Sequence, residues 1–168
     1  KDTVSFLADS LRYDYSEPQL HLLAPLAGTA IHEQYRGLLE LDDIYSDMSY
    51  QGWRQEPADR ELIAKFADVF VNFYAVPTPL DRQYLKELRS FLLHGISRFR
   101  WLLLALYQEC GGLLEVFDEW RSWRRNAHGG QAYERYYCSR EFRDDFLRFV
   151  REHYLDGGQE PKPAVSAV

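Results

Sequence analysis

The segment that decides the fold class is Phe99-Arg100-Trp101-Leu102-Leu103-Leu104-Ala105-Leu106-Tyr107, in which every residue except Arg100 is apolar. A helix without a polar face is typical of a position buried on all sides. The uninterrupted apolar run is far shorter than the roughly 20 residues that a helix needs to cross a bilayer. We therefore expect a central buried helix near residues 98–110 of a soluble protein with no membrane partner.

Apolar residues recur at helical spacing on both sides of this segment, and Gly, Pro and capping residues divide the pattern. Gly111-Gly112 and Gly129-Gly130 are expected to end helices, and the final helix is expected to begin at about Ser139. The helices predicted in this way cover about residues 3–15, 29–47, 57–76, 79–95, 98–110, 113–128 and 139–154.

Strand signals are nearly absent, because no Asn-Gly or Asp-Gly turn is flanked by alternating β-branched residues. The pattern predicts an all-α fold, an irregular orthogonal bundle of about seven helices. A chain of 168 residues is long enough for one domain with its own core. We expect a single helical domain over residues 1–155 and a flexible C-terminal tail over residues 156–168, where no core-forming pattern is present.

Charge and cysteine content exclude several classes of protein. The net charge is -6, which disfavours non-specific binding to nucleic acid or membrane surfaces by the chain as a whole. Two cysteines are too few for a disulfide scaffold or for a four-cysteine zinc site. We expect Cys110 and Cys138 to be free thiols that act as packing groups in a cytoplasmic protein.

The leading functional prediction is a non-enzymatic interaction or regulatory domain, of the adaptor, inhibitor, immunity or chaperone type. Residues 1–60 carry 5 Lys/Arg against 11 Asp/Glu, so the whole net negative charge lies in the first third of the chain. Exposed aromatic residues beside charge are typical of interface hot spots. The predicted partner-binding surface joins an acidic helix face to an aromatic loop and consists of Glu40, Asp43, Asp47, Tyr50, Trp53 and Arg54. A protein partner, basic in charge, would fit it.

A second cluster offers an enzymatic alternative. Arg121, Arg124, Arg125 and His128 share a helix face, and Arg135 follows soon after among tyrosines. Basic residues interleaved with aromatics suit phosphate contact and base stacking, so nucleic acid is the second expected partner class. Arg121-x6-His128 resembles the Arg-x4–6-His motif of the HEPN-domain ribonucleases. The resemblance implies metal-independent RNA cleavage by Arg121 and His128, in a homodimer that brings two such pairs together.

No motif for a bound nucleotide, a metal or a serine nucleophile is present, so we expect neither a cofactor nor a metal site. His94 leaves a third interpretation open, because a histidine beside the most apolar helix suits a haem ligand. In that case the chain would be a globin-like haem or ligand sensor domain.

Overall fold

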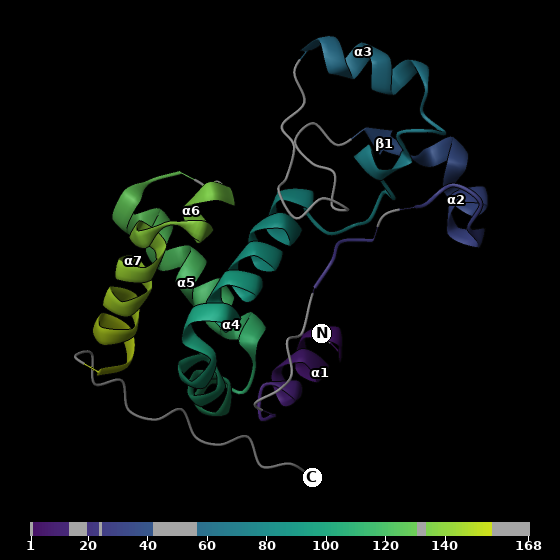
Figure 1. The fold of residues 1–168 in the computed structure, drawn as a ribbon. Helices are drawn as coiled ribbons and strands as arrows, with labels where there is room; N and C mark the ends of the chain where they lie inside the picture. Colours follow the sequence, from purple (N-terminus) through teal and green to yellow (C-terminus); the bar gives the residue numbers. More distant parts are fainter. Residues whose placement is uncertain (1, 14–19, 24, 42–56, 131–133, 156–168) are drawn as a thin grey trace. The chain divides into compact units, whose positions relative to one another are not determined.

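The structure, a computed structural model, describes residues 2–13, 20–23, 25–41, 57–130 and 134–155 (Figure 1). It has seven α-helices, and 74% of the described residues are helical. The predicted all-α class is therefore confirmed. The predicted tail at residues 156–168 lies outside the described residues. Within the described ranges no helix is both long and apolar enough to cross a membrane.

The chain divides into two compact units. The first unit joins residues 1–19 to residues 90–168, and the second unit comprises residues 20–89. The long helix α4 (Arg82–Cys110) contributes its first residues to the second unit and the rest to the first. A single domain over residues 1–155 stays a prediction.

The second unit holds the short helices α2 (Ala30–Tyr35) and α3 (Pro57–Lys65), the 3-10 turns η1 (Arg36–Leu38) and η2 (Val71–Phe73), and strands β1 (Glu40–Leu41) and β2 (Tyr74–Ala75). The strands pair antiparallel, with Glu40 opposite Ala75 and Leu41 opposite Tyr74. Thr29 caps α2, because its hydroxyl accepts a hydrogen bond from the His32 N–H at 3.3 Å.

The predicted helices over residues 29–47 and 57–76 are both too long. The chain turns extended at Leu39 (φ −65°, ψ 134°), so Glu40 lies in a strand and not on a helix. At the other end α3 stops at Lys65, and Tyr74 and Ala75 form the second strand. Pairing between segments more than thirty residues apart overrides the helical periodicity, which reflects only local spacing.

The first unit contains α1 (Asp2–Ser10), most of α4, α5 (Leu113–His128), α6 (Glu134–Cys138), α7 (Arg140–Val150) and a closing π-turn, η3 (Arg151–Leu155). Its predicted boundaries agree with the structure at both ends of α5 and at the start of α7, whereas α1 ends at Ser10 instead of near residue 15, and α6 was not predicted. Ser139 caps α7 by accepting from the Phe142 N–H at 3.2 Å. Gly111 (φ +78°) and Gly129 (φ +65°) follow the ends of α4 and α5 in the left-handed region that favours glycine.

The predicted break between residues 95 and 98 lies slightly further on. Helix α4 runs through Gly95 and kinks at Phe99, whose φ of −133° and ψ of 29° are not helical. The chain folds back so closely here that a Cβ at Gly95 would lie 3.1 Å from the Leu103 Cδ1 atom. Because Gly95 has no side chain, the Leu103 side chain can pack directly against the backbone before the kink.

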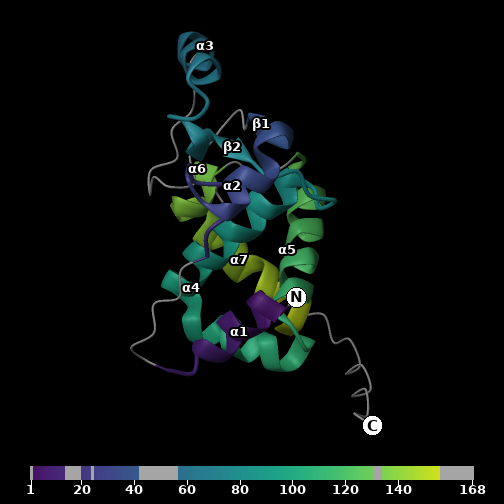
Figure 2. The same ribbon diagram turned by 90° about the vertical axis from the view of Figure 1, so that its right-hand side faces the viewer.

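The core of the first unit is aromatic and centres on Trp120, which is fully buried. Helix α5 contacts α7 and α1, and Figures 1 and 2 show α5 and α7 side by side. Trp120 packs against rings from α4, α6 and α7, namely Phe91, Tyr136, Phe142, Phe146 and Phe149. Such pairs add about 0.5–1.5 kcal/mol each beyond the burial of their area.

The segment that indicated the fold class is less buried than predicted. Leu103 and Leu106 are buried, but Trp101 is 59% exposed. The helix therefore buries only one stripe of its surface in the core, and apolar residues on its other side, such as Trp101, stay exposed to solvent. Arg100 explains part of this orientation, because its Nε donates to the Leu11 carbonyl at 3.0 Å and so holds the end of α1.

Candidate functional site

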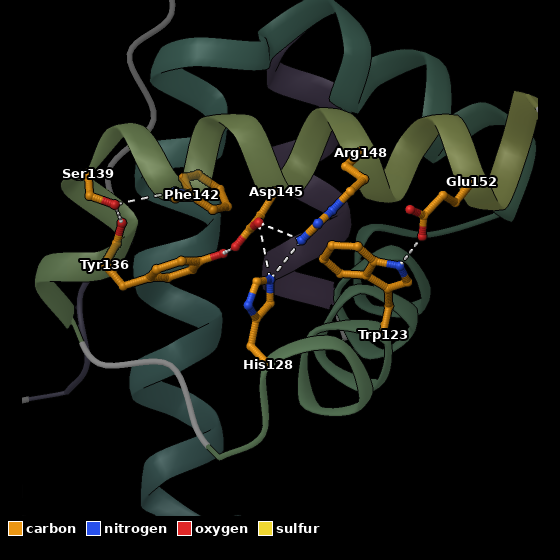
Figure 3. A network of polar contacts seen from close by, with 8 residues as sticks. All are labelled: Trp123, His128, Tyr136, Ser139, Phe142, Asp145, Arg148 and Glu152. Atoms are coloured by element: carbon orange, nitrogen blue, oxygen red, sulfur yellow. Dashed lines mark hydrogen bonds and ion pairs between the residues drawn. The ribbon is translucent and has the colours of Figure 1, made fainter.

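A polar network joins the end of α5 to one face of α7 (Figure 3). The His128 Nε2 lies 3.1 Å from Asp145 Oδ1. Arg148 Nη2 donates to the same carboxylate oxygen at 2.9 Å, and the Tyr136 hydroxyl donates to Asp145 Oδ2 at 2.8 Å. One carboxylate thus collects three donors from three helices.

Local signals in the sequence position these groups. Gly129 and Gly130 both adopt positive φ, which ends α5 at His128 and places the imidazole at the helix C-terminus. The Ser139 cap sets the start of α7 and hence the direction of its faces. Asp145 and Arg148 are three residues apart, so they share one side of α7.

Asp145 is a buried charge, since its side chain is only 8% exposed. The three donors offset the cost of removing the carboxylate from water. Burial, together with the hydrogen bond to Asp145, raises the pKa of Tyr136 well above its ordinary value. Tyr136 therefore stays protonated across the physiological range and remains a donor to Asp145.

The His128 imidazole is held through one of its two ring nitrogens. Its Nε2 lies 2.8 Å from Arg148 Nη2 as well as 3.1 Å from Asp145 Oδ1. These two contacts fix the orientation of the ring and leave Nδ1 as its second nitrogen, on a side chain that is 31% exposed.

Aromatic rings and a buried arginine surround the network. The Arg148 guanidinium lies over the Trp123 ring at 5.1 Å, and the Trp123 indole N–H donates to Glu152 at 2.7 Å. Arg124 stacks on Tyr136 with its guanidinium 4.1 Å from the ring centre and is only 7% exposed. The Nε and Nη1 atoms of Arg124 are buried without a hydrogen-bond partner. Unused donors on a buried cation suit an anionic ligand.

A metal ion is a second chemical option at this place. Ligand atoms of His128, Glu141 and Asp145 all lie within 4.8 Å of one another. However, Arg148 lies within hydrogen-bond distance of two of these three groups. Its positive charge opposes a cation there, and the arrangement suits an anion better.

The structure joins some of the predicted site residues and separates others. His128 lies in the network, Arg124 lies against it, and Arg125 and Arg135 are exposed on α5 and α6. Arg121 is half-buried, and its Nη2 atom is buried. Sequence reasoning missed Asp145, Tyr136 and Arg148. The signal for them was weak: a polar stripe at residues 141, 145, 148 and 152 along an otherwise strongly amphipathic helix.

The predicted acidic and aromatic surface is described only at Glu40, which is exposed on β1. Asp43, Asp47, Tyr50, Trp53 and Arg54 lie outside the described residues, so partner binding through this surface stays a prediction. His94 is half-buried and pairs with Cys138, with 3.3 Å between Nε2 and Sγ. Haem binding by His94 is likewise not tested.

No protein-family model, curated protein or solved structure matches this chain.

Proposed function

We propose that the chain is a metal-independent ribonuclease in which His128 acts as general base and Asp145 positions it. The observation that carries the proposal is the part-exposed His128, held at Nε2 by the buried carboxylate of Asp145. A histidine oriented in this way through one nitrogen has the other free for proton transfer. The resemblance of Arg121-x6-His128 to the HEPN ribonuclease motif agrees with this role.

Phosphodiesters suit the charges around the imidazole. Arg148 lies next to His128, and the buried Arg124 stacks on the Tyr136 ring with its Nε and Nη1 donors unused. A guanidinium group can donate hydrogen bonds to two phosphate oxygens at once, and its positive charge stabilises the negative charge that develops on them. RNA is favoured over DNA because it supplies its own nucleophile, the 2′-hydroxyl, and no metal-bound water is then required.

The reaction moves two protons: the 2′-hydroxyl of the substrate loses one, and the departing 5′-oxygen gains one. His128 Nδ1 takes the proton of the 2′-hydroxyl while the oxygen attacks phosphorus. The bond from phosphorus to the 5′-oxygen breaks, and that oxygen takes a proton from a second acid. In the homodimer that the resemblance implies, the second acid is the same histidine of another copy. We place this activity in the cytoplasm, in keeping with two cysteines that form no disulfide.

The test uses single-stranded RNA and the matching DNA, in the presence of EDTA. RNA but not DNA should be cleaved, and His128→Ala should lower the rate by about 100-fold or more. Asp145→Asn should lower kcat with little change in KM, since it acts on orientation. His153→Ala is the matched control, because His153 is also exposed but lies on η3 beside Glu119.

Three outcomes would overturn the proposal. The first is cleavage by His128→Ala at the wild-type rate, and the second is no cleavage of RNA by the wild type. The third is activity that EDTA removes and a divalent metal restores, which would favour the metal arrangement of His128, Glu141 and Asp145.

A further inference from the structure

A cysteine–histidine pair lies in the first unit, apart from the residues of the His128 network. The Cys138 Sγ is 3.3 Å from His94 Nε2, although the two residues are 44 positions apart in the chain. Cys138 is exposed, so the expectation that it acts as a packing group is wrong. The imidazole is close enough to take the thiol proton directly, which is the arrangement that activates a cysteine nucleophile.

The surroundings of this pair are electropositive. Cys138 immediately precedes Ser139, the N-cap of the 11-residue helix α7, whose N-terminus carries partial positive charge. Arg98, one turn after His94 on α4, donates to the Ser139 carbonyl at 2.6 Å and also to the Cys138 carbonyl. A helix N-terminus, a guanidinium and an imidazole each favour the thiolate over the thiol.

A pocket of about 430 Å³ lies next to the pair: its lining includes Ser139, the residue after Cys138, but neither Cys138 nor His94. It is lined by three arginines, one aromatic ring and the capping serine: Arg98, Arg140, Arg143, Phe99 and Ser139. Two carboxylates lie on the same part of α7: Asp144, 3.0 Å from Arg143 and 3.9 Å from Arg140, and Glu141 in the first turn. The three guanidiniums of the lining outnumber them by one. A ligand that carries carboxylates would be attracted to this pocket.

We propose that Cys138 and His94 form a site of thiol–disulfide exchange that takes small disulfides bearing carboxylates. His94 accepts the thiol proton, and the thiolate attacks one sulfur of the disulfide. The sulfur–sulfur bond of that ligand breaks as a mixed disulfide forms on Cys138. The departing thiolate takes the proton from His94, so Cys138 is oxidised and one ligand sulfur is reduced.

The chain supplies its own control cysteine. Cys110 is half-buried, its thiol donates to the Tyr154 hydroxyl at 3.4 Å, and neither it nor its chain neighbours line the arginine pocket. The Cys110→Ser variant keeps Cys138 as its single cysteine, and the Cys138→Ser variant keeps Cys110. Neither cysteine is a member of the network around His128, so this proposal and the ribonuclease proposal are tested on different residues and fail independently.

The experiment measures the rate at which each single-cysteine variant reacts with an anionic disulfide, dithiobis(nitrobenzoate), and with neutral dithiodipyridine. At slightly acidic pH, Cys138 should react about tenfold faster than Cys110 with either reagent. His94→Gln in the Cys110→Ser background should remove most of this advantage. Arg140→Ala with Arg143→Ala should slow the anionic reagent about tenfold at low salt and leave the neutral one unchanged.

Equal rates for the two cysteines would overturn the proposal, as would a His94→Gln variant that reacts like its parent. Loss of both reagents' rates in the double arginine variant would overturn the assignment of the pocket. The helical circular dichroism and melting temperature of each variant show whether a lost rate comes from a lost fold.

Discussion

Replacing Asp145 with alanine tests whether the network at the end of α5 is a connected unit. The change removes the acceptor of three donors at once. The Tyr136 hydroxyl is fully buried and would lose its hydrogen bond, which costs about 1–3 kcal/mol. The lost contacts of Arg148 and His128 with Asp145 contribute up to about 1 kcal/mol more to the destabilisation, because both side chains are partly exposed and solvent screens their charges. Asp145→Ala should therefore lower the free energy of unfolding by about 2–4 kcal/mol.

The assay is urea unfolding followed by tryptophan fluorescence, which reports the core around Trp120. Asp144→Ala is the matched control, because Asp144 is the preceding residue and its side chain is 57% exposed. That change should stay within about 0.5 kcal/mol of the parent. Tyr136→Phe, alone and combined with Asp145→Ala, completes a double-mutant cycle.

The cycle separates the buried hydrogen bond from the rest of the network. Its interaction energy should be about 1 kcal/mol or more, because Tyr136 and Asp145 contact each other directly. An Asp145→Ala cost no larger than that of Asp144→Ala, or an interaction energy near zero, would refute the reasoning.

Two further predictions concern pH and the central apolar segment. Because the pKa of Tyr136 is raised in the folded state by burial and by its bond to Asp145, the folded chain keeps a proton that unfolded tyrosine loses near pH 10. The contribution of Tyr136 to the free energy of unfolding should be fully present below that pH and fall above it by about 1.4 kcal/mol per pH unit. Tyr136→Phe should remove this contribution and make the fall shallower in alkaline unfolding curves, and an unchanged slope would count against the assignment. Leu103→Asp should lower the free energy of unfolding by several kcal/mol, since it replaces a fully buried side chain with an unpaired charge. Trp101→Asp, at an exposed position of the same run, should lower it by under about 1 kcal/mol. Similar melting temperatures for the two variants would contradict this prediction.

The sequence by itself determined the fold class and most of the helix boundaries in the first unit. Thr29, Ser139, Gly111 and Gly129 act on backbone groups within a few residues of themselves, so their effect can be read from local spacing. His128 was also identified in this way, as part of a basic helix face. Periodicity likewise predicted that Leu103 is buried, but it could not show that Trp101 faces solvent.

Only the tertiary structure decided which distant residues meet. The β1–β2 pairing, the contact of His128 with Asp145 and the pairing of His94 with Cys138 join positions 17 to 44 residues apart. These contacts depend on how helices cross, where α4 kinks and in which register the strands pair. The repeat of apolar residues specifies which face of an element is buried, but it does not specify the neighbour against which that face packs.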